Sequence, residues 1–292
     1  MLTLRPPLQD RLTMTTESST RAALRRLWRI PAVVVWIGCG LLLSLVMALL
    51  QKLTARPMGA ERQRWARWWM CGLLRVLPLR VKCHGLPATG TRLLISNHVS
   101  WLDIILIGAH TPVHFLSKAE VRDWPVIGWL AAAAGTLFIQ RGQTGGTSLQ
   151  TQLTNALQQG HSLVIFAEGT TTAGDQLRTF HGRLLSCAID SATPIQPVAI
   201  AYRQQGQPDT IAPFINDDEF SAHLLKLLGS PRIDVELHFL EDLQPSAGNR
   251  NQLARKSQAA VSQALGLTPD SGAELSSELA TGTAVERLKS AA

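Results

Sequence analysis

The sequence is short of the residues and motifs that mark several large protein classes. Its 292 residues include one tyrosine and four cysteines. Cys39, Cys71, Cys83 and Cys187 are scattered without a C-x-x-C pair, which argues against a disulfide framework or a metal site and favours a reducing compartment. No G-x-S-x-G or G-x-x-x-x-G-K-[ST] motif occurs, so a serine hydrolase and a P-loop NTPase are disfavoured.

Charged residues are also few, and they are unequal in sign. They make up 17% of the chain, and 28 Lys and Arg against 21 Asp and Glu give a formal net charge of +7. A basic chain is expected to meet an anionic partner, such as nucleic acid or anionic lipid. All eight tryptophans lie in the first 129 positions, and tryptophan is enriched at membrane interfaces. Without any zinc-finger, bZIP or RNA-binding signature, we expect membrane lipid and no nucleic acid as partner.

Residues 30–50 contain no charged side chain and would span about 32 Å as a helix, enough to cross a bilayer. Basic residues flank this segment on both sides, among them Arg25, Arg26 and Arg29 before it and Lys52 after it. The charges therefore leave open whether the helix spans the bilayer or enters one leaflet and returns. A buried core helix is the alternative.

The next segment, residues 61–77, predicts an amphipathic helix. Trp65, Trp68 and Trp69 fall at i, i+3 and i+4, with arginines at other positions, as in a helix lying at a membrane interface. Its alternative is a helix packed on the rest of the chain. We thus expect a membrane-binding helical arm over 21–78, after a disordered N-terminus over 1–20.

Residues 79–245 predict an α/β domain with a largely parallel mixed sheet flanked by helices. Short apolar runs alternate there with helical stretches. The expected strands are 79–83, 93–96, 113–116, 136–139, 163–166, 195–201 and 233–239, and the expected helices are 101–109, 146–159 and 183–190. A C-terminal helix near 249–265 and a flexible tail complete the last region, 246–292.

The run NHVSWLD contains the most reactive pairing in the chain, His98 and Asp103. An imidazole held by a carboxylate commonly takes a proton from a hydroxyl near neutral pH. Five residues along one helix would place the two side chains on different faces, so they meet only if His98 precedes the helix and Asp103 lies in its first turn. Ser100 is then the expected N-cap, and Ser100-x-x-Asp103 reads as a capping box. Capping alone is the competing interpretation of Asp103.

Two further blocks follow expected strands. Arg141 lies just past residues 136–139, where a guanidinium could bind a phosphate or a carboxylate. Glu168, Gly169 and Thr170 follow residues 163–166, and the glycine would let a ligand approach the backbone closely. A solvated arginine and a plain turn are the respective alternatives.

Taken in order, NHVSWLD, FIQRG, FAEGTT and IQPVAI resemble the motifs of the lysophosphatidic acid acyltransferase family, the 1-acylglycerol-3-phosphate O-acyltransferases. The family pattern is N-H-x-x-x-x-D, a Gly/Arg loop, F-P-E-G-T-R and a V-P-V-type strand. Ala167 replaces the family proline, and Thr171 replaces a frequent arginine. FAEGTTTAG is therefore similar to the F-P-E-G-T-T subset, which includes lyso-ornithine lipid acyltransferases.

The resemblance implies direct acyl transfer, with His98 as the base and Asp103 fixing its tautomer. Arg141, Glu168, Gly169 and Thr170 would bind the acceptor. Lys118, Arg178 and Arg183 are candidate contacts to acceptor or donor. The donor would be acyl-CoA or an acyl-carrier protein thioester, and neither a metal nor a bound cofactor is expected.

For the acceptor, the resemblance favours 1-acyl-sn-glycerol-3-phosphate, which would become phosphatidic acid. Lyso-ornithine lipid or another lysolipid is the alternative. A non-catalytic membrane-binding protein is a third interpretation, which an intact His98–Asp103 pair disfavours. The expected location is a bacterial inner membrane, on its cytoplasmic side.

Overall fold

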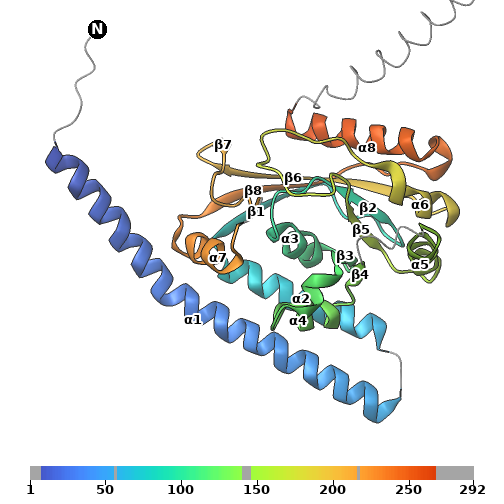
Figure 1. Cartoon of the computed structure of the whole chain (residues 1–292), viewed down its shortest axis with the longest axis horizontal. Coiled ribbons are helices and arrows are strands. Elements are labelled where there is room, and N and C mark those ends of the chain that lie inside the picture. The colour runs from blue at the N-terminus through green and yellow to red at the C-terminus, as the bar shows by residue number, and fades with distance from the viewer. Residues whose placement is uncertain (1–7, 56–57, 140–145, 216–217, 268–292) are drawn as a thin grey trace, which may run out of the picture.

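The computed structural model describes residues 8–55, 58–139, 146–215 and 218–267 (Figure 1). In this part of the chain, eight strands form one sheet in the order β1-β8-β6-β2-β5-β3-β4, with β7 paired to β6. The strands are β1 (Leu79–His84), β2 (Leu93–Ser96), β3 (His114–Lys118), β4 (Leu137–Ile139), β5 (Leu163–Phe166), β6 (Ile195–Gln204), β7 (Gln207–Pro208) and β8 (Ile233–Phe239). Only the pairs that β6 makes with β7 and β8 are antiparallel, so the prediction of a largely parallel mixed sheet is confirmed.

Strands β2 and β5 place two functional loops at one edge of the sheet. They are parallel neighbours, and their last residues, Ser96 and Phe166, lie opposite each other. Residues of β2 are buried on both faces, as expected for a central strand covered by helices on each side. The segments that follow Ser96 and Phe166 therefore leave the sheet together, although many residues separate them in the sequence.

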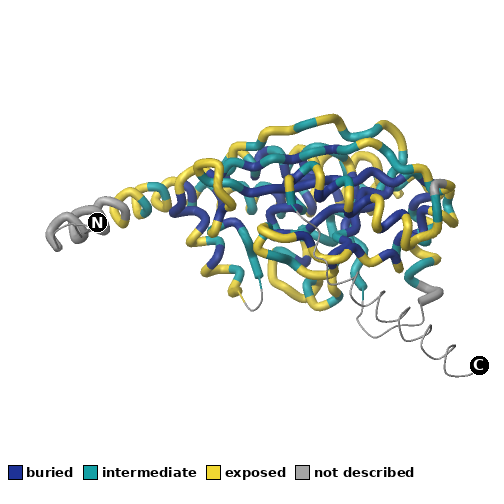
Figure 2. The backbone as a smooth tube through the Cα atoms, turned by 90° about the horizontal axis from the view of Figure 1, so that it is seen from above, coloured by how far each residue is buried: buried dark blue, intermediate teal, exposed yellow. Residues whose placement is uncertain are grey.

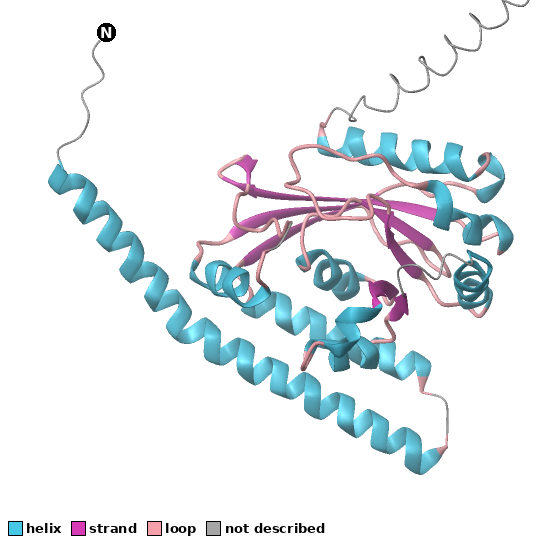
Figure 3. Cartoon of the chain, in the orientation of Figure 1, coloured by secondary structure: helices cyan, strands magenta, loops and turns pink. Residues whose placement is uncertain are grey.

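Helices cover both faces of the sheet (Figures 1 and 3). One face carries α1 (Leu8–Thr54), α2 (Gly59–Val76), α3 (Leu102–His110), α4 (Ile127–Ala133) and α7 (Phe220–Gly229). The other carries α5 (Gly146–Gln158), α6 (Ser186–Asp190) and α8 (Arg250–Leu265). Three short 3-10 turns are η1 (Ala119–Asp123), η2 (Gly182–Leu185) and η3 (Pro245–Ala247). The buried segments follow the sheet and the helices against it (Figure 2).

The N-terminal helix differs from the sequence prediction at its start. We expected residues 1–20 to be disordered, but α1 begins at Leu8, so the prediction is wrong from that residue onward. No proline stands between Leu8 and Pro31, and extending an existing helix costs far less than nucleating one. The helix of the apolar segment therefore continues toward the N-terminus.

The expected two-helix arm is present as α1 and α2, which run in opposite directions (Figure 1). Two tryptophans join them. The Trp36 indole donates to the Trp69 carbonyl at 2.8 Å, and the Trp69 indole donates to the Trp36 carbonyl at 2.9 Å. Gly40 faces the Trp69 ring and Gly72 faces the Trp36 ring, each at a distance that leaves no room for a β-carbon.

Helix α2 combines the two interpretations left open for it. It buries Met70 and Leu73 in the core beside α3, where the Met70 sulfur sits against Gly108. Its Trp65 and Trp68 are 43% and 46% exposed, which leaves an aromatic surface facing outward. One side of the helix is therefore part of the domain core, and the other side is a candidate membrane interface.

Among the described residues, one segment is long and apolar enough to cross a membrane, Ser19–Thr54 of α1, and 17% of its most apolar window is buried. Two helices were not predicted, α4 and α7. They are seven and ten residues long, too short for a clear hydrophobic period. The single helix expected over 183–190 is instead the turn η2 followed by α6.

Candidate active site

The structure brings His98 and Asp103 together in the way the sequence required. His98 lies in the loop after β2, and Asp103 lies in the first turn of α3. The His98 Nδ1 is 2.8 Å from the Asp103 Oδ2, with the histidine side chain 19% exposed and the aspartate fully buried. This arrangement orients the ring and leaves Nε2 as the nitrogen that could take a proton.

The Asp103 carboxylate also holds the loop that precedes α3. Its Oδ2 accepts hydrogen bonds from the backbone N–H groups of Val99 at 2.7 Å and Ser100 at 3.0 Å. The same oxygen thus orders the loop and holds the imidazole, so the interpretation of Asp103 as a capping residue alone is wrong.

The predicted capping role of Ser100 is wrong. The helix N-cap is Trp101, which makes no side-chain cap bond. The Asp103 N–H donates to the Ser100 carbonyl, so this donor is not available to the serine hydroxyl. Within the described structure, the buried Ser100 Oγ has no hydrogen-bond partner.

Tyr202 is a site residue that the sequence reasoning missed. Its hydroxyl donates to the Asp103 Oδ1 at 2.6 Å, from a buried position on β6. Burial, followed by the charge of Asp103, raises the pKa of Tyr202 well above its ordinary value, which keeps the phenol protonated as a donor. The pair is 99 residues apart in the sequence, and the only available signal was that this is the sole tyrosine of the chain.

Glu168 holds the loop that carries His98. One carboxylate oxygen accepts the His98 backbone N–H at 2.7 Å, and the other accepts that of Arg178 at 3.0 Å. The residue is 4% exposed. Burial raises the pKa of Glu168, and the two backbone hydrogen bonds oppose that shift. Glu168 thus bridges the two loops, and its direct contact with the acceptor stays a prediction.

Neighbouring residues complete this support. Gly169 has a φ of +71°, a conformation that favours glycine, and turns the chain after Glu168. The Thr172 N–H donates to the His98 carbonyl at 2.9 Å. The Phe166 ring stacks on the imidazole with a centroid distance of 3.9 Å. The histidine is thus held from its backbone, its ring face and its Nδ1.

His98 opens into a mainly apolar cavity of about 1040 Å³. Side chains from α1, α2, α3 and α4 form much of its wall. Of the predicted ligand contacts, Gly169, Thr170 and Lys118 line the cavity. A base at the wall of a large apolar space fits chemistry on a hydroxyl attached to a long hydrocarbon chain.

Two of the three predicted arginines, Arg178 and Arg183, are not brought to this cavity. Arg178 and Arg183 are exposed and are not among the residues that line it. Arg178 contributes its backbone N–H to Glu168, and Arg183 belongs to η2. Arg141 lies outside the described residues.

Comparison with known proteins supports an acyltransferase. The Acyltransferase family profile matches residues 80–201. A protein named lyso-ornithine lipid O-acyltransferase from Pseudomonas aeruginosa is 45% identical, over 84% of this chain and 95% of its own length. A protein of the same name from Rhodobacter capsulatus is 32% identical, over 77% and 86%.

More distant relatives carry another acceptor in their names. The 1-acyl-sn-glycerol-3-phosphate acyltransferase of Neisseria gonorrhoeae is 30% identical, over 51% of this chain and 58% of its own. The crystal structure of the 1-acyl-sn-glycerophosphate acyltransferase PlsC from Thermotoga maritima has a TM-score of 0.59 at 20% identity and covers 85% of this chain and 96% of that one. That likeness supports the fold. The identity to the P. aeruginosa protein over nearly all of its length shows that this chain belongs to the acyltransferase family.

Proposed function

We propose that this enzyme is a lyso-ornithine lipid O-acyltransferase. The reaction type rests on one geometric observation, a His98–Asp103 pair at the wall of a large apolar cavity. The acceptor rests on the relatives, because those named for lyso-ornithine lipid match most of this chain, at up to 45% identity. The 1-acyl-sn-glycerol-3-phosphate acceptor favoured by the family resemblance is supported less, by a relative that matches 51% of the chain.

In the proposed reaction, the His98 Nε2 takes the proton of the acceptor hydroxyl while its oxygen attacks the thioester carbonyl of the donor. The new C–O ester bond forms and the C–S bond breaks. The thiolate that leaves then takes the proton from the His98 imidazolium. Asp103 stabilises the imidazolium formed between these two steps. The donor is acyl-CoA or an acyl-carrier protein thioester, and the transfer requires no bound cofactor because the thioester is already activated.

We further propose that α1 embeds the enzyme in a bacterial inner membrane, with the active site on the cytoplasmic side, where thioester donors are made. Leu42, Leu45 and Leu49 are 63%, 52% and 54% exposed on this helix, which is the apolar surface that lipid would cover. High-salt and alkaline washes should leave the protein in the membrane fraction. Release by either wash would show attachment by charge alone.

The function is tested with the purified full chain, a thioester donor and a panel of lysolipids. We expect ester formation on lyso-ornithine lipid and a loss of about 10²–10⁴-fold in His98→Ala, the usual contribution of a general base. His84→Ala, on the edge strand β1, is the matched control and should keep wild-type activity. Acylation of lysophosphatidic acid but not of lyso-ornithine lipid would overturn the acceptor assignment.

A further inference from the structure

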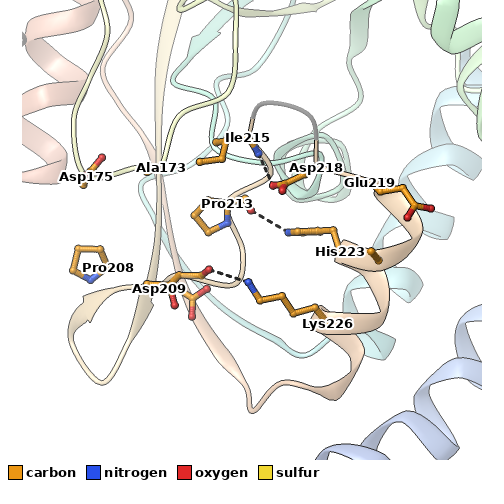
Figure 4. Close-up of a pocket in the computed structure, with 12 residues that line it drawn as sticks. Ala173, Asp175, Pro208, Asp209, Pro213, Ile215, Asp218, Glu219, His223 and Lys226 are labelled. Atoms are coloured by element: carbon orange, nitrogen blue, oxygen red, sulfur yellow. Dashed lines mark hydrogen bonds between the residues drawn. The ribbon is translucent and has the colours of Figure 1, made fainter.

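A second cavity, of about 510 Å³, is acidic (Figure 4). It is bounded by the β6–β7 hairpin, the segment around Ala173 and the first half of α7. Its charged lining residues are Asp175, Asp209, Asp218, Glu219 and Lys226. Four carboxylates against one ammonium give this cavity the opposite sign to the chain as a whole, which carries +7.

Asp209 gives this cavity a buried carboxylate with an unused oxygen. The residue is 3% exposed, and its Oδ1 accepts the backbone N–H groups of Ile211 at 2.8 Å and Ala212 at 2.6 Å. The other oxygen, Oδ2, has no hydrogen-bond partner in the described part of the chain. Because a buried charge is costly unless it is paired, this oxygen calls for a donor or cation.

Lys226 stands on the wall opposite Asp209, on α7 (Figure 4). Its ammonium reaches the Thr210 carbonyl at 3.4 Å, a long and weak contact. The Asp218 carboxylate accepts the Ile215 N–H at 3.0 Å. The Glu219 carboxylate likewise accepts the Ser221 hydroxyl. The cavity therefore offers Asp175, Asp209 and the remaining acceptor oxygens of Asp218 and Glu219 to a cation, and Lys226 to an anion.

Short backbone links connect this cavity to the catalytic histidine. The Thr172 N–H bonds to the His98 carbonyl, and the Phe214 N–H bonds to the Val99 carbonyl at 3.0 Å. Phe214 lines the apolar cavity into which His98 opens, whereas its neighbours Pro213 and Ile215 line the acidic cavity. The same short segment thus lines both cavities.

We propose that the acidic cavity binds the amino-acid head group of the acceptor, with its side-chain ammonium toward the carboxylates and its carboxylate toward Lys226. This inference rests on the proposed function. A phosphate head group would meet four carboxylates there, and like charges inside one cavity repel each other. The cavity therefore selects a zwitterionic head group, which carries an ammonium, over a phosphate.

The test compares the wild-type enzyme with the double variant Asp175→Asn/Glu219→Gln. Both residues are exposed, so the variant should fold, and its melting temperature is checked. The matched control is Asp190→Asn/Glu241→Gln, which removes two exposed carboxylates away from this cavity. The acceptors are lyso-ornithine lipid, its analogue with the side-chain amine acetylated, and lysophosphatidic acid.

For the double variant we expect the KM for lyso-ornithine lipid to rise about tenfold with kcat little changed, the order expected when hydrogen bonds to a charged group are lost. The control variant should match wild type. The wild-type enzyme should discriminate against the acetylated analogue, and the double variant should lose that discrimination. The KM for lysophosphatidic acid, measured wherever turnover is detectable, should stay the same or fall.

The outcomes separate this proposal from the proposed function. If wild type acylates lyso-ornithine lipid but the double variant keeps the same KM and the same discrimination, the cavity does not bind the head group and the function stands. If wild type does not acylate lyso-ornithine lipid at all, the proposed function fails, and this inference fails with it.

Discussion

Asp103 is the residue on which the site converges. Its carboxylate holds the His98 ring, two backbone N–H groups of the same loop and the Tyr202 hydroxyl. A buried carboxylate satisfied on both oxygens has little freedom to rotate, so the imidazole it orients is held in one position and one tautomer.

Tyr202→Phe should lower kcat about tenfold and leave both KM values nearly unchanged. The substitution removes the donor to the Asp103 Oδ1 and leaves that oxygen buried and unpaired. We also expect a loss of about 1–3 kcal/mol in unfolding free energy, the cost of one unsatisfied buried group. Steady-state kinetics and thermal unfolding on one preparation measure both. An unchanged kcat per folded molecule would limit Tyr202 to a role in packing.

At the scale of elements, the α1–α2 hairpin depends on two glycines. A β-carbon at Gly72 would lie 1.8 Å from the Trp36 ring, and one at Gly40 would lie 2.4 Å from the Trp69 indole nitrogen. Both rings are also held by their reciprocal indole hydrogen bonds, so neither can move away cheaply. Close contact between the helices therefore follows from small residues facing large ones.

Gly40→Ala and Gly72→Ala should each destabilise the protein by about 1–3 kcal/mol, the usual cost of forcing atoms into a packed contact. Gly38→Ala is the matched control, because nothing lies within 4 Å of the added carbon. The control should be neutral or more stable by up to about 1 kcal/mol, since alanine favours helix over glycine. Thermal unfolding in detergent compares the three, and equal effects would contradict this account of the hairpin.

The basic flank before the apolar segment also has a structural task. Arg29 is 6% exposed, and its guanidinium donates to the carbonyls of Leu228 at 2.9 Å and Ser230 at 2.7 Å, at the end of α7. Arg25 and Arg26 donate to other carbonyls there, those of Gly229 and Leu225. Cations at a helix C-terminus are favourable, so these arginines dock α1 onto α7.

Arg29→Met should therefore lower stability without releasing the protein from membranes. Loss of two charge-assisted hydrogen bonds predicts a cost of about 1.5–3 kcal/mol. Arg75→Met, in the last turn of α2, is a comparable loss of charge and should have little effect on unfolding. Membrane fractionation and thermal unfolding together distinguish docking of α1 onto α7 from binding of lipid. A stable Arg29 variant that leaves the membrane would mean that Arg29 binds lipid.

At the scale of the whole molecule, three histidines make stability depend on pH. Burial, the largest cause in each case, lowers the pKa of His114, His223 and His238 below the ordinary value of 6.5. Between the folded and unfolded values, the unfolded chain binds more protons. Their contribution to stability is thus full above pH 6.5 and is lost as the pH falls through the folded values.

We expect the melting temperature to fall on acidification below pH 6.5, and His223→Gln to reduce that dependence. In the folded protein the Trp101 indole donates to the His223 Nδ1 at 3.1 Å, and this contact requires a neutral ring. Glu168 acts in the opposite sense, because a raised carboxyl pKa loses its contribution as the pH rises above 4.5. Melting curves from pH 5 to 8 for wild type and variant isolate the histidine. An identical dependence in both would contradict the assignment.

Local patterns of the sequence were enough to predict most elements of the fold. Strands β2, β5 and β8 begin and end where the apolar runs do, and the long uncharged segment is a helix. The pairing of His98 with Asp103 was also predictable, because their meeting depends only on a loop and the first turn of the following helix. Hydrophobic period and motif spacing carry this information because they act over a few residues.

What the tertiary structure alone decided is which distant residues meet. Tyr202 reaches Asp103 across 99 residues, and Glu168 joins the loops after β2 and β5. The arginines that precede the apolar segment bind the end of α7 some 200 positions later. The acidic cavity is likewise assembled from three segments. None of these contacts leaves a periodic trace along the chain, because each depends on how the sheet is ordered and how its helices pack.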